Sequence, residues 1–154
     1  MLHGAETLYL LKEQPQRHAT LVTDVGVRLP AQLTASGRSM LAHLPAAQVR
    51  ALFPGPLVDR TGVGPRSLTE LRRVLAEDVR RGWSVEDGHV TDGFASIAAC
   101  SFDHTGRPAA AVTVTFRRDT RDEKTWPQLA GRVRSTAADL TRRLSGHAPS
   151  QAAF

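Results

Sequence analysis

The chain has 154 residues, of which 41% are hydrophobic and 23% are charged, and its formal net charge at pH 7 is +5. This length suits one ordinary domain, and the composition is that of a globular protein, which excludes collagen-like and disordered chains. No stretch approaches the roughly 18 consecutive apolar residues of a membrane span. The single cysteine cannot form an internal disulfide and the N-terminus shows no secretory signal, so we expect a cytoplasmic protein with no membrane partner.

Positive charge is spread evenly along the chain. Residues 1–77 hold nine basic and six acidic side chains, and residues 78–154 hold eleven and nine. The densest charged run, residues 117–124, mixes both signs, which is typical of a solvated loop. We therefore predict that this chain by itself does not recognise a DNA sequence.

The first half of the chain is predicted to alternate extended segments with short helices. β-Branched and large apolar residues favour strands, Thr34 is a good helix cap, and Pro45 suits the first turn of a helix. In chain order, the expected elements are strands over residues 6–11 and 19–23, an extended segment ending at Leu29-Pro30, a short helix capped by Thr34 that carries residues 40–42, and a helix from about Pro45 to Phe53.

The second half contains the clearest helix. Ser67-Leu68-Thr69-Glu70 is a capping box, an apolar stripe follows it, and Gly82 is a natural C-terminal stop. After it we expect a strand over residues 83–86, a hairpin of residues 96–102 and 109–116, and a helix over residues 125–144 with Leu129, Val133, Ala137, Leu140 and Leu144 on its apolar side. These elements predict an α+β domain, in which one antiparallel sheet has helices packed against it.

The hairpin carries a row of hydroxyl groups on one face. Period 2 puts Thr113 and Thr115 on the same side of their strand, and pairing Phe102 with Ala109 would bring Ser96 opposite Thr115. The other side chains on this face are small, so it could be the floor of a pocket. It could equally be a solvated face, because threonine favours strands in any case.

No signature of catalysis or metal binding stands out. The chain has no Gly-rich phosphate loop, no His-Glu-x-x-His, no Gly-x-Ser-x-Gly and no Cys-x-x-Cys, and its six histidines are scattered. Cys100 lies in an apolar strand without a neighbouring base, which indicates a small buried hydrophobe. We expect no enzymatic activity, no metal and no cofactor.

Several segments together resemble the effector-binding domain of IclR-type transcriptional regulators. The resemblance runs from about residue 4 to residue 146 and keeps the order and spacing of the family. The matching segments are Leu29-Pro30, Thr34-Ala35-Ser36-Gly37-Arg38, Leu41-Ala42, Leu71, Val79-Arg80-Arg81-Gly82-Trp83 and residues 93–103, which read Gly-Phe-Ala-Ser-Ile-Ala-Ala-Cys-Ser-Phe-Asp.

The resemblance implies a GAF-like domain over residues 1–146, and we expect the end of the chain, residues 147–154, to be a flexible tail. It implies an effector, typically a small organic acid or aromatic metabolite, held between the sheet and the start of the first helix. The family positions that hold the effector correspond to the amides of Ala35 and Ser36, to the acidic Glu86, and to Ser96, Thr113 and Thr115 on the strands.

The resemblance also implies partners. Members of the family carry a DNA-binding helix-turn-helix domain before this one and assemble into homodimers or homotetramers. That domain has no counterpart in residues 1–154, so we expect operator DNA to be bound through a preceding segment. The alternative to such a regulator is a stand-alone GAF-like sensor of small molecules.

Overall fold

The computed structural model describes residues 1–14 and 24–149 of the chain. Its strands are β1 (Leu2–His3), β2 (Glu6–Leu8), β3 (Arg28–Pro30), β4 (Ser84–Asp87), β5 (Phe94–Phe102) and β6 (Pro108–Arg117). Its α-helices are α1 (Ala35–Leu41), α2 (Ala46–Leu52), α3 (Leu68–Arg81) and α4 (Trp126–Arg143), and two 3₁₀ turns cover Arg118–Thr120 and Glu123–Thr125.

The strands form two antiparallel sheets instead of the single sheet expected. One sheet has the order β1-β2-β3 and the other has the order β4-β5-β6. The expected α+β class with antiparallel pairing is confirmed, but the N-terminal strands are only two or three residues long and pair with one another. The strand predicted over residues 19–23 lies outside the described residues.

The long hairpin of β5 and β6 has the predicted register. Ser96 pairs with Thr115 and Ala98 pairs with Thr113. At the turn end the register shifts by one residue, so that Phe102 pairs with Pro108 and not with Ala109. This irregularity lies far along the hairpin from Ser96, and the row of hydroxyl groups is therefore on one face as expected.

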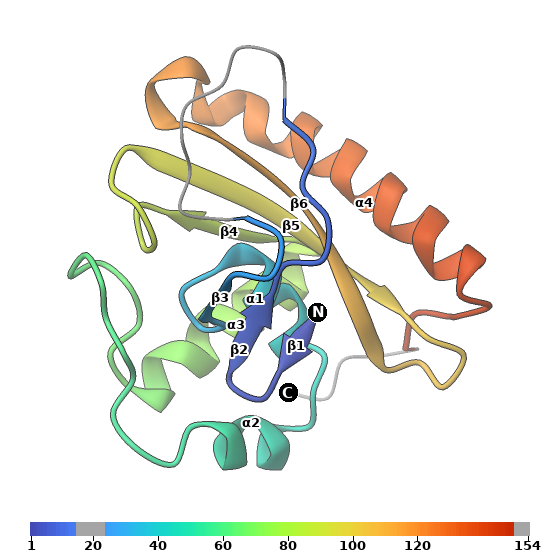
Figure 1. Cartoon of the computed structure of the whole chain (residues 1–154), viewed down its shortest axis with the longest axis horizontal. Coiled ribbons are helices and arrows are strands. Elements are labelled where there is room, and N and C mark those ends of the chain that lie inside the picture. The colour runs from blue at the N-terminus through green and yellow to red at the C-terminus, as the bar shows by residue number, and fades with distance from the viewer. Residues whose placement is uncertain (15–23, 150–154) are drawn as a thin grey trace.

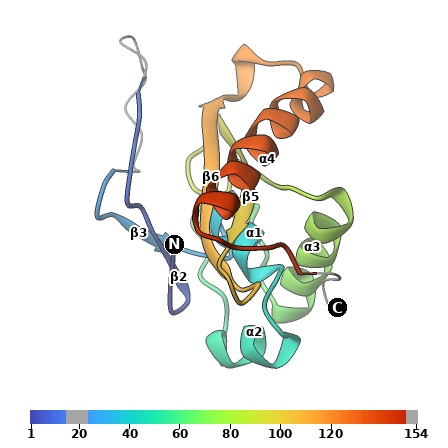
Figure 2. The ribbon, with the colours of Figure 1, turned by 90° about the vertical axis from the view of Figure 1, so that its right-hand side faces the viewer.

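Helices cover both faces of the β4-β5-β6 sheet (Figures 1 and 2). On one face, α4 buries Trp126, Ala130, Val133 and Ala137 against Ile97 and its neighbours on β5. On the other face, α1 lies against β5 and β6, and it joins α2 and α3 in a second apolar core. The hydroxyl face of the hairpin is thus covered by α1, which answers the question that the sequence left open.

The helix signals behave as expected, with one correction. Thr34 caps α1 by accepting from Gly37 N at 2.9 Å, Ser67 caps α3 by accepting from Glu70 N at 3.1 Å, and Gly82 ends α3 with φ of 80°. On α4, however, the buried side is that of Ala130, Val133, Ala137 and Thr141, while Leu144 is exposed. The expected stripe is therefore confirmed at Val133 and Ala137 and wrong at Leu144, because the most buried positions beside them hold the small Ala130 and the hydroxyl residue Thr141, which fit closely against the sheet.

Residue 147 is in contact with the rest of the domain. His147 N donates to Asp103 O at 3.3 Å, beside the β5–β6 turn, and its ring lies 3.2 Å from where a Cβ on Gly106 would be. Residues 150–154 of the predicted flexible tail lie outside the described residues.

Candidate functional site

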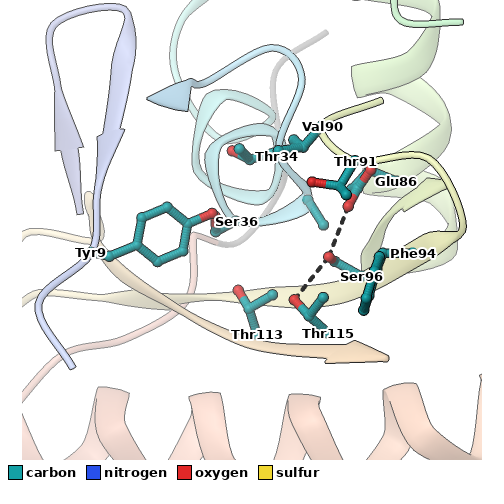
Figure 3. Close-up of a pocket in the computed structure, with 11 residues that line it drawn as sticks. Tyr9, Thr34, Ser36, Glu86, Val90, Thr91, Phe94, Ser96, Thr113 and Thr115 are labelled. Carbon is teal, nitrogen blue, oxygen red and sulfur yellow. Dashed lines mark hydrogen bonds between the residues drawn. The ribbon is translucent and has the colours of Figure 1, made fainter. Parts of the chain in front are cut away.

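A pocket lies between the start of α1, the hydroxyl face of the β4-β5-β6 sheet and the segment that follows β2 (Figure 3). It encloses about 370 Å³ of space free of protein atoms, part of which is open to solvent. Eleven residues line it: Tyr9, Thr34, Ala35, Ser36, Glu86, Val90, Thr91, Phe94, Ser96, Thr113 and Thr115.

All six residues that the sequence marked as candidates line this one pocket, namely Ala35, Ser36, Glu86, Ser96, Thr113 and Thr115. Phe94 was missed although period 2 along β5 puts it on the face of Ser96. Tyr9, Val90 and Thr91 carried no local signal, because their positions depend on how separate segments pack. The structure therefore brings the candidates together and adds a tyrosine, a phenyl ring and the turn after β4.

The start of α1 is held by a network of hydroxyl groups. Thr34 Oγ1 accepts from Gly37 N and lies 3.0 Å from Thr7 Oγ1 of β2. Gly37 allows this approach, since a Cβ there would lie 2.5 Å from both Ala31 Cα and Thr7 Oγ1. The N–H groups of Ala35 and Ser36 belong to the first turn and have no acceptor within the helix. They are donors at the pocket wall.

On the floor of the pocket, two of the three hydroxyl groups are engaged and one is not. Ser96 Oγ donates to Glu86 Oε1 at 2.8 Å and lies 2.9 Å from Thr115 Oγ1 (Figure 3). Thr113 Oγ1 is buried and has no hydrogen-bond partner among the described residues. Tyr9 Oη lies 3.5 Å from Ser36 Oγ on the other side of the pocket. A buried hydroxyl without a partner is uncommon and marks Thr113 as a place where a ligand can bond.

Glu86 is a buried acid, with only 4% of its surface exposed. Its Oε2 accepts from His89 N at 3.1 Å and its Oε1 accepts from Ser96 Oγ. Burial raises the pKa of Glu86, because the charged form loses solvation, while these donors and the nearby Arg38 act in the opposite direction. The acid end of the pocket is therefore held by fixed donors and by a buried cation.

Arg38 connects the pocket to α3. Its guanidinium donates to Val85 O, lies 3.1 Å from His89 Nδ1, and has its Nε 3.6 Å from Asp78 Oδ2. Arg81 donates to the other oxygen of Asp78 at 2.5 Å. Burial and the adjacent Arg38 lower the pKa of His89 to about 4, so its ring is neutral at pH 7 and Nδ1 can accept from Arg38.

The described residues offer no alternative site of stronger chemistry. No three His, Cys, Asp or Glu side chains among them lie close enough to hold a metal ion. A second cavity of about 200 Å³ lies between α1, α3 and β5 and includes Cys100. Burial raises the pKa of the Cys100 thiol, which is the behaviour of a buried hydrophobe and not of a nucleophile.

A family model described as "Bacterial transcriptional regulator IclR C-terminal" matches residues 1–142. The chain belongs to the IclR family. Of the two alternatives, this assignment supports a domain of a transcriptional regulator and not a stand-alone sensor. The transcriptional regulator KipR of Bacillus subtilis is 25% identical over 147 residues, which are 94% of this chain and 58% of that protein.

Solved structures of IclR-family proteins have the same fold. The repressor BlcR of Agobacterium tumefaciens has a TM-score of 0.82 and 28% identity, over 92% of this chain and 56% of that one. An IclR homologue from Microbacterium hydrocarbonoxydans, solved in complex with 4-hydroxybenzoate, has a TM-score of 0.80 and 23% identity, over 94% and 58% of the two chains. At that identity the second likeness shows the fold alone.

The chain spans a little over half the length of the regulators that it matches, 58% in the case of KipR. Across residues 1–14 and 24–149, none of the helices is both long enough and apolar enough to span a membrane.

Proposed function

We propose that this domain binds a small organic or aromatic acid between α1 and the β4-β5-β6 sheet, and that it thereby regulates a DNA-binding protein of which it is part. The observation that carries the proposal is the unpartnered Thr113 hydroxyl, buried in the floor of a pocket. The amides of Ala35 and Ser36 and the hydroxyl of Tyr9 add donors among the residues that line the same pocket. Such donors can bind a carboxylate without a lysine or arginine in the pocket.

The ligand of one structure of the same fold supports an acid as the effector. The Microbacterium homologue of the same fold was solved with 4-hydroxybenzoate, an aromatic acid. In the present chain, Ser36 lies at the helix end of the pocket, whereas Glu86, Ser96 and Thr115 lie at the opposite end (Figure 3). We propose that an acid effector contacts both ends.

A thermal-shift screen of residues 1–154 against aliphatic and aromatic acids tests the binding function. We expect one or more acids to raise the melting temperature in a concentration-dependent way, because a ligand that binds only the folded state stabilises it. The ligands should be recovered unchanged, since we propose no enzymatic activity and no cofactor or metal. No stabilisation by any acid, or turnover of one, would overturn the proposal.

We propose that operator DNA is bound through a helix-turn-helix domain and not through this domain. The basic side chains here are dispersed, so they can give only weak, salt-sensitive binding without sequence preference. A mobility-shift assay with residues 1–154 at physiological salt should show no operator-specific complex. A specific complex would contradict this part of the proposal.

We further propose that the domain works as a homodimer or homotetramer in the cytoplasm. Helix-turn-helix regulators bind two half-sites, and their symmetry requires at least two copies. Light scattering at high micromolar concentration should show self-association of residues 1–154, and a strictly monomeric mass would count against it.

A further inference from the structure

The hydrogen bonds from Thr115 through Ser96 to Glu86 form a chain whose direction is set by its last member. An ionised carboxylate has no proton, so Ser96 must donate to Glu86 Oε1 across 2.8 Å. Ser96 then has no proton left for its other neighbour. Thr115 therefore donates to Ser96 across 2.9 Å and has only lone pairs to offer to the pocket.

Burial raises the pKa of Glu86, whereas the donors from Ser96 and His89 and the nearby Arg38 act against that shift, so the ionised form gains as the pH rises. The cations Arg38 and Arg81 and the acid Asp78 form a cluster with Glu86. The positive and negative charges of this cluster are equal only when Glu86 is ionised, and the neutral His89 adds no charge. The charged and titratable groups that face Glu86 are Arg38 from α1, Tyr9 from the segment after β2 and His89 from the turn after β4, with Asp78 and Arg81 of α3 beyond Arg38.

The fixed donors around Glu86 also suit a carboxylate. Its Oε2 accepts from the backbone N–H of His89, and a backbone donor cannot reverse. Only the Ser96 side can change direction. The end of the pocket formed by Glu86, Ser96 and Thr115, called here the acceptor end, thus presents hydrogen-bond acceptors and a negative charge.

We propose that the acceptor end selects effectors that carry a hydroxyl or another hydrogen-bond donor remote from their carboxylate. This rests on the function proposed above, and it narrows the ligand class from acids to hydroxy acids and their like. A carboxylate placed at the acceptor end would face Glu86 and be repelled, so the acid group points toward Thr113 and the start of α1. A ligand without the donor covers the free lone pairs of Thr115 Oγ1 without bonding them, which costs affinity.

Glu86→Gln should reverse the direction of the hydrogen bonds that connect residues 86, 96 and 115. His89 N–H still requires an acceptor, so the Gln oxygen takes that side and its NH₂ group faces Ser96. Ser96 would then accept from Gln and donate to Thr115, and Thr115 would donate into the pocket. The variant should lose the preference for a donor and gain one for an acceptor.

Calorimetric titration of residues 1–154 at pH 8 tests this with matched acids. The probes are 4-hydroxybenzoate against benzoate, 3-hydroxybutyrate against butyrate, and 4-formylbenzoate, whose extra carbonyl can only accept. We expect the wild-type chain to bind the hydroxy member of at least one pair roughly ten- to hundredfold more tightly. Glu86→Gln should favour 4-formylbenzoate over benzoate, which the wild-type chain should not do, whereas 4-hydroxybenzoate can still accept a hydrogen bond and keep part of its advantage. Ser96→Ala, which removes the middle hydroxyl of this series of hydrogen bonds, should also reduce the ratio of the two affinities.

The matched control is Asp87→Asn, which removes the next acid of β4, an exposed side chain that pairs with Arg118 outside the pocket. Asp87→Asn should retain the wild-type ratio of affinities for the hydroxy acid and its partner. Melting curves of all variants report whether they are folded. Equal affinity for both members of every pair, or no gain of 4-formylbenzoate over benzoate in a folded Glu86→Gln variant, overturns this inference and leaves the proposed function standing. Failure of every acid to bind overturns the proposed function as well.

Discussion

Ser96 and Thr115 face each other across the β5–β6 hairpin, and their hydroxyl oxygens are 2.9 Å apart beneath the start of α1. Opposite positions on antiparallel strands bring side chains this close, so the pair follows directly from the register. The pair makes the two threonines of β6 different, because Thr115 has a partner and Thr113 has none. Equal roles for both, which the sequence alone suggested, do not match the hydrogen bonds.

The first prediction concerns Thr113→Val. Valine keeps the branched shape and removes a buried hydroxyl without a partner, so the free energy of unfolding should stay the same or rise by up to about 1 kcal/mol. Affinity for an acid effector should fall roughly ten- to hundredfold, because a hydrogen bond to an ionised group is lost. Titration and chemical denaturation measure the two effects. Thr136→Val, on the exposed side of α4, is the control that should change neither affinity nor fold.

The second prediction concerns Arg38→Met. Arg38 is 1% exposed and is the buried counter-ion of Asp78, so its removal leaves a buried acid short of a partner. The free energy of unfolding should fall by about 3–5 kcal/mol. Urea denaturation measures it, with Arg80→Ala as the control, since the exposed Arg80–Glu77 pair should contribute no more than about 1 kcal/mol. A loss below 1 kcal/mol for Arg38→Met would show that the cluster is not a stabilising unit.

The third prediction compares two helical glycines. Gly37→Ala places a Cβ 2.5 Å from Ala31 Cα and from Thr7 Oγ1, so α1 must move and stability should fall by about 1–3 kcal/mol or more. Gly131→Ala in α4 meets no atom within 4 Å and should instead stabilise by about 0.5–1 kcal/mol through helix propensity. Melting temperatures of the two variants should therefore move in opposite directions. A shift in the same direction would contradict the close packing of α1 on β2.

The fourth prediction concerns acid stability. The pKa of His89 is lowered from 6.5 to about 4 in the folded chain, so between these values the unfolded chain binds a proton that the folded chain does not. His89 therefore lowers the stability progressively as the pH falls from about 6.5 to 4. His89→Asn, which keeps an acceptor for Arg38, should lose less stability than the wild type between pH 7.5 and pH 4.5 in urea denaturation. His104→Asn, in the exposed β5–β6 turn, is the control, and an identical pH dependence in wild type and His89→Asn would refute the argument.

The sequence by itself determined the local elements and the hairpin register. Capping residues at Thr34 and Ser67 and the stop at Gly82 act within one or two turns, so they are readable without a fold. The alternation along β5 and β6 together with the turn between them determined that Ser96 opposes Thr115. The similarity to a known family, not the local pattern, pointed to Ala35, Ser36 and Glu86.

Only the tertiary structure decided what those residues face. Tyr9 reaches the pocket because β2 packs beside the start of α1, and no short-range pattern encodes that contact. Arg38 looks like an ordinary charged helix residue, yet it is buried beside Asp78, forty positions away in the chain. Burial and charge pairing depend on segments that are distant in sequence. Glu86 becomes a buried acid, and the Thr113 hydroxyl a buried group without a partner, only when α1 packs over the sheet.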